Sequence, residues 1–183
     1  MRARNLKTVV FLLLAILMCV SPAYADDVQP LQLYEDKVKA ALIYNFLKYT
    51  NWSADALAKS HNNLQLCLLG DDSFDNYLYL LKGRTVEQYT ITITPAKNVS
   101  ETGNCSAVFV HRNHEDALPR LLQSLNGKQV LTISDIDRFA SQGGMLEIHK
   151  QDDHIGFFIN KQAVGQAGLS VQGRLLKLAS SNN

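Results

Sequence analysis

The polar residues best placed for chemistry follow short apolar runs. Ser134 and Asp135 come directly after the run 130–133. If that run is a strand, the pair lies at its carboxyl end, where α/β folds place ligand contacts, and both residues are candidates for a ligand pocket. A helix N-cap is the alternative explanation of the same pair. His111 and His114 follow another run and could form half of a metal site, but no cysteine or carboxylate pattern completes it.

Motifs of the common enzyme classes do not occur in the sequence. It holds no G-x-G-x-x-G, no P-loop and no G-x-S-x-G, so neither a nucleotide site nor an acyl enzyme is indicated. A secreted hydrolase would need a nucleophile and a base, and no such pair stands out. We therefore expect a protein that is not an enzyme, with no catalytic residue, metal or cofactor.

The N-terminus has the features of a cleavable signal peptide. Three basic residues precede an apolar run over 9–20, and Ala23-Tyr24-Ala25 has the small-x-small pattern that signal peptidase reads. The run is shorter than the ~20 residues that a bilayer span needs. We expect cleavage after Ala25, so that residues 1–25 are the signal peptide and 26–183 form one periplasmic domain. An uncleaved N-terminal anchor is the alternative.

The charge of the expected mature chain argues against a nucleic-acid partner. Cleavage would remove three of the 18 Lys and Arg residues and none of the 17 Asp and Glu residues. The mature chain would then hold 15 basic and 17 acidic residues, for a net charge of −2. Proteins that bind nucleic acid present a basic surface instead, and no polybasic cluster suits a membrane surface either.

Two cysteines remain after cleavage, because Cys19 leaves with the leader. In an oxidising compartment the simplest state of Cys67 and Cys105 is one disulfide. It would close a loop of about 39 residues and stabilise the fold by roughly 3–4 kcal/mol on the chain-entropy model. Two separately buried thiols are the alternative. The spacing does not suit a C-x-x-C redox site.

The remaining pattern alternates helices with short buried strands. We expect helices over 31–50, 73–81, 115–125, 136–141 and 160–166, strands over 64–69, 85–94, 105–110 and 130–133, a hairpin of 145–149 with 154–159, and a helix or strand-like tail over 171–179. This order predicts an α/β fold: a single three-layer domain whose mixed, mostly parallel sheet has helices on both faces and a β-hairpin in the C-terminal half.

Gly156-Phe157-Phe158-Ile159 is apolar on both faces of its expected strand. Such a strand is covered on both sides, either by a helix of the same chain or by a partner protein.

Several blocks of sequence resemble the YfiR-like family. The segment 39–52, KAALIYNFLKYTNW, is similar to the family's KAAFLYNFAKFVEW opening, and 66–74, LCLLGDDSF, resembles its LCVLGDDPF strand and turn. Further blocks match at 105–110, 130–135, 139–145, 158–169 and 175–179. The matches run in order from about residue 37 to 179.

The resemblance implies an exported regulator. Known members sit in the periplasm and repress an inner-membrane diguanylate cyclase by contacting its extracytoplasmic domain, and an outer-membrane lipoprotein can titrate the repressor away. The resemblance also implies an α/β fold, a Cys67–Cys105 disulfide and a possible homodimer. It places Leu146 and Val164 near the family's apolar partner surface, so both are candidate partner-binding residues, although both could instead be core. An exported small-ligand-binding domain is the alternative function.

The chain departs from the family at a second cysteine pair. Some members carry one around the hairpin strand, and the approximate matching positions here are Ala140 and Glu147. Redox control through that pair is therefore not expected.

Overall fold

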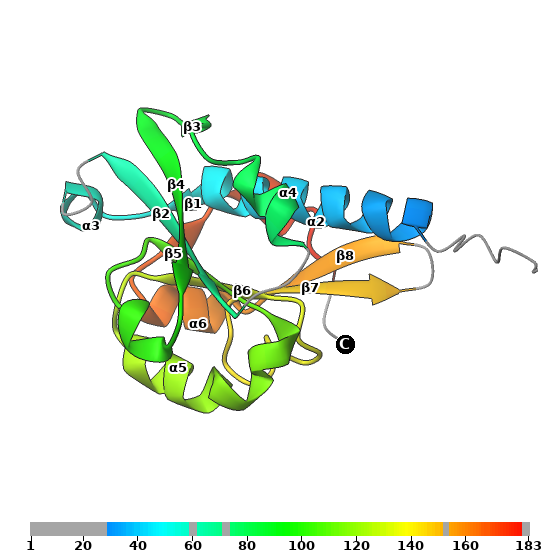
Figure 1. Ribbon diagram of the computed structural model, residues 1–183. Coiled ribbons are helices and arrows are strands. Elements are labelled where there is room, and N and C mark those ends of the chain that lie inside the picture. The colour runs from blue at the N-terminus through cyan, green and yellow to red at the C-terminus, as the bar shows by residue number, and fades with distance from the viewer. Residues whose placement is uncertain (1–28, 59–61, 71–73, 152–153, 181–183) are drawn as a thin grey trace, which may run out of the picture. The chain divides into compact units, whose positions relative to one another are not determined.

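The computed structural model describes residues 29–58, 62–70, 74–151 and 154–180 (Figure 1). The chain divides into two units, residues 1–32 and 33–183, and each is taken by itself. Of the first unit, only 29–32 are described, as the start of a helix. The predicted signal peptide lies outside the described residues. Within the described ranges, no helix combines the length and apolar character needed to cross a membrane.

The second unit is built on a seven-stranded sheet. Its strands are β2 (Asn63–Leu69), β3 (Thr85–Val86), β4 (Tyr89–Ala96), β5 (Ala107–Val110), β6 (Leu131–Ser134), β7 (Leu146–Gln151) and β8 (His154–Ile159). They lie in the order β3-β4-β2-β5-β6-β7-β8. The five central strands are parallel, while β3 and β8 are antiparallel to their neighbours. The predicted mixed, mostly parallel sheet with a late hairpin is confirmed.

The order of the parallel strands reverses once. From β2 the chain moves outward to β4, returns past β2 to β5, and then continues to β6 and β7. The point between β2 and β5 is therefore a topological switch point, and ligands of open α/β sheets commonly bind outside the carboxyl ends of the strands there.

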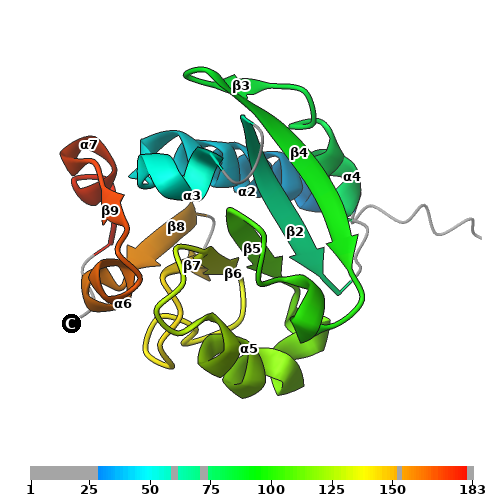
Figure 2. The ribbon, with the colours of Figure 1, turned by 90° about the vertical axis from the view of Figure 1, so that its left-hand side faces the viewer.

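Helices lie on both faces of the sheet, as Figure 2 shows. They are α2 (Gln29–Tyr49), α3 (Ala54–Ala58), α4 (Asp75–Tyr79), α5 (Leu118–Leu125), α6 (Lys161–Gln166) and α7 (Gly173–Leu176), with the 3₁₀ turns η1 (Val99–Glu101) and η2 (Arg112–Ala117). α5 covers one face of the sheet, whereas α2 and α4 cover the other.

The side-chain period of two divides each buried strand between two cores. In β5, Ala107 and Phe109 pack with residues of α2 and α4, while Val108 and Val110 pack with α5. All four side chains are fully buried. A parallel strand covered on both faces is apolar throughout, which explains the uninterrupted runs in the sequence.

A two-stranded sheet ties the end of α2 to the C-terminal segment. β1 (Thr50–Asn51) pairs antiparallel with β9 (Ser170–Val171). The Thr50 hydroxyl donates to the Phe46 carbonyl at 2.7 Å and helps to end α2. The tail expected over 171–179 thus contains both a short strand and the helix α7.

Two expectations about single elements were wrong. The stretch 85–94 is a hairpin, β3 and β4, with Glu87 at a positive φ of 52°, and Pro95 lies inside β4. β3 pairs only with Thr90 and Tyr89 of β4. In the described part of the chain, the rest of that side of β4 is an unpaired edge of the sheet. Pro95 is tolerated there because no hydrogen bond between strands needs the N–H that proline lacks. The stretch 136–141 forms turns instead of a helix, with Arg138 at a φ of 61°.

Candidate functional site

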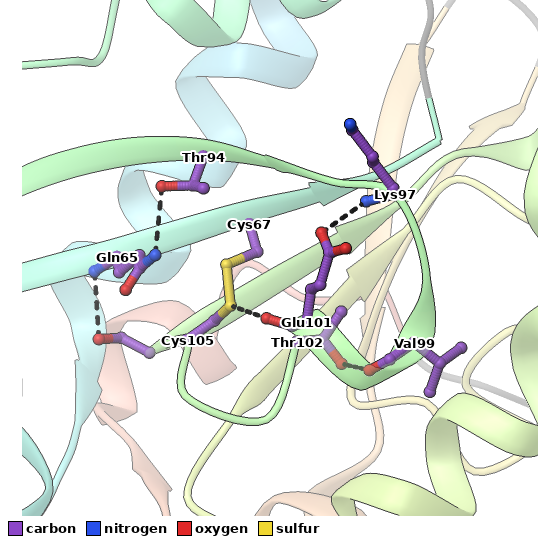
Figure 3. The surroundings of a disulfide bond; sticks show 9 residues. Gln65, Cys67, Thr94, Lys97, Val99, Glu101, Thr102 and Cys105 are labelled. Carbon is purple, nitrogen blue, oxygen red and sulfur yellow. Dashed lines mark hydrogen bonds between the residues drawn. A yellow bond between two sulfur atoms is a disulfide. The ribbon is translucent and has the colours of Figure 1, made fainter.

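The predicted disulfide is present and joins two neighbouring parallel strands (Figure 3). Cys67 lies in β2, and Cys105 lies just before β5, with 6.0 Å between their Cα atoms. Both residues are almost completely buried, in the core that α5 covers. A buried bond that closes a long loop across the middle of a sheet is suited to stabilising the fold, and such bonds are typical of extracytoplasmic proteins.

Ser134 and Asp135 lie at the carboxyl end of β6, as predicted, but their polar groups are used within the protein. The Ser134 hydroxyl donates to the Val110 carbonyl at 2.8 Å and accepts from the Ile136 amide at 3.0 Å, and the residue is fully buried. Asp135 forms an ion pair with Lys39 of α2 at 2.7 Å. The pair thus holds β6, β5 and α2 together, and these contacts account for Ser134 without a ligand.

His111 also has a partner within the fold. Its Nε2 lies 2.8 Å from Asp75 Oδ1, and its ring packs edge-on against Phe109 with 4.8 Å between ring centroids. His114, by contrast, is half-buried, with its Nδ1 3.1 Å from Asn113 Oδ1. In the part of the chain that the structure describes, no group of three or more His, Cys, Asp or Glu side chains could hold a metal ion.

Leu146 and Val164 both lie in the core. Leu146 is 0% exposed and Val164 is 4% exposed, and both pack in the core beneath α2. Leu146 faces the core beneath α2, whereas its neighbour Glu147 points to the opposite face of β7 and is also buried; Val164 is the buried residue of α6. Both environments match the alternative that these residues are core, and partner binding by either residue stays a prediction.

The positions matched to the second cysteine pair are linked by a hydrogen bond. The Glu147 carboxylate accepts from the Ala140 amide at 2.9 Å and from the Arg138 amide at 3.1 Å. Glu147 is only 6% exposed. A buried carboxylate needs such donors, and here they come from the turns that join β6 to β7.

A strip of cations and tyrosines crosses the outer side of α2. We call Tyr44, Lys48, Tyr49, Arg84 and Arg174 the basic–aromatic strip. Arg84 lies over the Tyr44 ring at 5.9 Å, and Tyr49 lies between Lys48 at 5.4 Å and Arg174 at 6.0 Å, measured to the ring centroids. Tyr44 and Lys48 are neighbours on the helix surface at i and i+4, so the two groups are continuous.

The three cations are exposed, the two tyrosines are half-buried, and none of the five residues is acidic. Hydrogen bonding to Arg174 and the charges of Lys48 and Arg174 hold the pKa of the Tyr49 phenol below its usual value of 10.0, although partial burial opposes this shift. The strip is therefore a concentrated positive surface with aromatic groups in it.

Two clefts lie at opposite ends of the parallel strands. A cleft of about 860 Å³ at the amino ends of the parallel strands is mostly polar, and Trp52, Asn63, Gln65, Asn104, Ser106 and Gln129 line it. The Trp52 indole N–H donates to the Ser106 carbonyl at 3.1 Å, which fixes the ring. A cleft of about 670 Å³ lies at the carboxyl ends, beside Leu69 and Lys97. Ser134 and Asp135 line neither cleft.

Sequence reasoning missed the basic–aromatic strip. The i, i+4 pair of Tyr44 and Lys48 on a helix could have been noted from the sequence alone. Arg84 and Arg174, however, are 90 residues apart in the numbering, and only the pairing of β1 with β9 and the placement of β3 bring them to the same helix.

One known protein family matches most of the chain. The sequence profile described as YfiR/HmsC-like matches residues 36–180. The chain belongs to the YfiR/HmsC-like family. The match takes in every strand of both sheets, the disulfide and the whole of the basic–aromatic strip, so the YfiR/HmsC-like domain coincides with the fold described above.

Other comparisons add less to the YfiR/HmsC-like assignment. The search of curated proteins finds no match. Among solved structures, the chain is similar to "the ABC domain in complex with L-Trp from Streptococcus pneumonia", with a TM-score of 0.46, 12% sequence identity, and coverage of 68% of this chain. This chain spans 58% of the length of that one.

Proposed function

We propose that the protein is a periplasmic, non-enzymatic regulator that binds the extracytoplasmic domain of an inner-membrane diguanylate cyclase and represses cyclic-di-GMP synthesis. The observation that carries the proposal is the YfiR/HmsC-like match over residues 36–180. The buried Cys67–Cys105 disulfide supports an extracytoplasmic location, because structural disulfides persist in oxidising compartments.

The basic–aromatic strip supports a protein partner with an acidic surface. Arg and Tyr are enriched at the energetic centres of protein interfaces, where a tyrosine supplies contact area and a guanidinium pairs with carboxylates. The mature chain expected from the sequence carries a net charge of −2, so three cations beside two tyrosines are a local departure from its average charge. An outer-membrane lipoprotein that titrates the repressor would compete for this surface.

Repression follows if binding discriminates between two states of the cyclase. A ligand shifts an equilibrium only by the difference between its affinities for the two states. The regulator therefore binds the inactive arrangement of the receptor more tightly than the active one. No reaction by the regulator itself is required.

The direct test uses membranes that contain the cyclase and the purified mature protein. Addition of the protein is expected to lower cyclic-di-GMP formation in a saturable manner. The double variant Tyr49→Ala/Arg174→Gln is expected to raise the concentration needed for half-inhibition by about tenfold or more, because it removes both an aromatic anchor and a charged contact.

The matched control is Tyr79→Ala/Arg138→Gln, which also removes one tyrosine ring and one exposed arginine but lies outside the basic–aromatic strip and outside both clefts. This control is expected to inhibit as the wild type does. No inhibition by the wild-type protein would contradict the proposed function. Equal loss of inhibition in both double variants would exclude the strip as the docking surface.

A small-ligand-binding role is the second candidate, and the 860 Å³ cleft favours it. Its volume lies within the range of ligand sites, and its lining offers amide groups and one fixed indole ring. A ligand bound there would raise the melting temperature of the protein in a screen of periplasmic metabolites. The increase would disappear in Trp52→Ala but persist in Tyr49→Ala/Arg174→Gln, and an increase in all three proteins would place the ligand elsewhere.

A further inference from the structure

The cleft at the carboxyl edge of the sheet lies at the topological switch point. Leu69 ends β2, Lys97 follows β4, and Asn113 belongs to η2, which follows β5. The chain leaves β2 toward α4 on one face and leaves β5 toward α5 on the other (Figure 2). Separation of the two crossovers opens a crevice at this point, and its volume of about 670 Å³ suits a small ligand.

Two exposed cations from different elements line this cleft. Lys97 comes from the loop after β4, and Arg120 comes from α5. Among the residues that the structure describes, neither the Lys97 ammonium nor the Arg120 guanidinium has an ion-pair or hydrogen-bond partner. Both charges therefore remain available to a ligand.

The nearest acid on the Lys97 loop does not neutralise that lysine. The two oxygens of Glu101 accept from the Lys97 backbone amide and from the Asn98 side-chain amide, each at 3.0 Å. Figure 3 shows the Lys97 side chain extending away from the Glu101 carboxylate. The hydroxyl of Ser100 donates to Asn98 and that of Ser124 donates to Leu121, so the two cations are the main groups left to select a ligand.

The backbone beside the cleft depends on a glycine. Gly70 has a φ of +96°, and a Cβ at this position would come within 2.7 Å of Asn113 Oδ1 and 2.8 Å of His114 Nδ1. The end of β2 can therefore approach η2 closely only with glycine.

We propose that this cleft binds a phosphate group, with Lys97 and Arg120 as its cationic ligands. A phosphomonoester has three acceptor oxygens and a charge between about −1.5 and −2 at neutral pH, so it can pair with both cations at once. Leu69, Val99 and Ala117 supply an apolar floor for the rest of the ligand. Among the described residues that line the cleft, Asp116 is the carboxylate that would oppose an anion there.

The test uses the full mature chain and inorganic phosphate as the probe, titrated by calorimetry at constant ionic strength. Saturable binding is expected. Lys97→Gln/Arg120→Gln should weaken it by at least about tenfold, because two charge-assisted hydrogen bonds are lost. Asp116→Asn should strengthen it, since a like charge is removed. The matched control is Lys161→Gln/Lys177→Gln, which removes two exposed cations elsewhere and should leave the affinity unchanged.

Vesicles of phosphatidylglycerol distinguish the source of the phosphate group. Retention on vesicles that depends on Lys97 and Arg120, without binding of inorganic phosphate, would assign the site to a lipid headgroup. Absence of binding to either probe would overturn the proposal, as would equal losses in the Lys161/Lys177 control. The inference does not rest on the cyclase proposal, because calorimetry with phosphate needs no cyclase.

Discussion

The Glu147 carboxylate accepts a hydrogen bond from the Ala140 amide at 2.9 Å, across the turns that join β6 to β7. These two residues occupy the approximate positions at which some members of the YfiR-like family carry a second cysteine pair. A buried carboxylate thus provides a non-covalent link at this place in the fold, and the link does not respond to oxidants.

Replacement of Glu147 by Gln is expected to destabilise the protein by roughly 1–3 kcal/mol, because one backbone amide then faces an NH₂ group instead of an oxygen. The free energy of unfolding in urea measures the effect. Glu115→Gln changes an exposed carboxylate and serves as the control. Equal stability of the Glu147 variant and the wild type would show that the carboxylate does not hold these turns.

The same link explains where the sequence was misleading. Apolar residues over 136–141 indicate a helix, but Glu147 captures the amides of Arg138 and Ala140, and Arg138 adopts a left-handed φ. That contact comes from another element, so no local pattern contains it. The buried strands were predictable for the opposite reason, since burial on both faces leaves an uninterrupted apolar run in the sequence itself.

The candidate site residues also fall into two groups, those that the sequence predicts and those that only the folded structure brings together. Cys67 and Cys105 could be paired by counting, because the mature chain expected from the sequence offers no other cysteines. Ser134 was correctly placed at the carboxyl end of a strand, but its hydroxyl bonds could not be foreseen without the neighbouring strand β5. The basic–aromatic strip depends on residues that are far apart in the chain, and it becomes visible only in the folded structure.

The disulfide should contribute to stability and have no other role. Cys67→Ala/Cys105→Ala is expected to lower the free energy of unfolding by roughly 3–4 kcal/mol, through the entropy of the opened loop. Reduction of the wild-type protein with dithiothreitol should cause a similar loss, and the double variant should not respond to the reductant. A variant that keeps its full stability but loses repression would show that the bond is a switch.

Leu146→Asp is expected to unfold the protein, because it places a charge in a fully buried site beneath α2. Leu146→Ala should fold but lose about 2–5 kcal/mol. Circular dichroism and urea unfolding separate the two cases. A folded Leu146→Asp protein that no longer binds its partner would instead support the earlier hypothesis that Leu146 contacts the partner.

Tyr49 should ionise below the usual tyrosine pKa of 10.0, because its hydrogen bond to Arg174 and the neighbouring charges lower the pKa of its phenol. A depressed pKa stabilises the folded protein above the unfolded-state pKa, and this contribution disappears as the pH falls through the folded-state value. Alkaline titration of the phenolate absorbance should therefore show an early component. Arg174→Gln should remove it, whereas Arg84→Gln, beside Tyr44, should not.

The central claim is that the exported protein restrains a cyclase, and the most direct measurement is cellular cyclic-di-GMP with and without the gene. Deletion should raise cyclic-di-GMP. The exported wild type should restore the low level, whereas a form without residues 1–25 and the exported Tyr49→Ala/Arg174→Gln variant should not, at equal protein abundance. Unchanged cyclic-di-GMP after deletion, or full restoration by the form that lacks residues 1–25, would contradict the account.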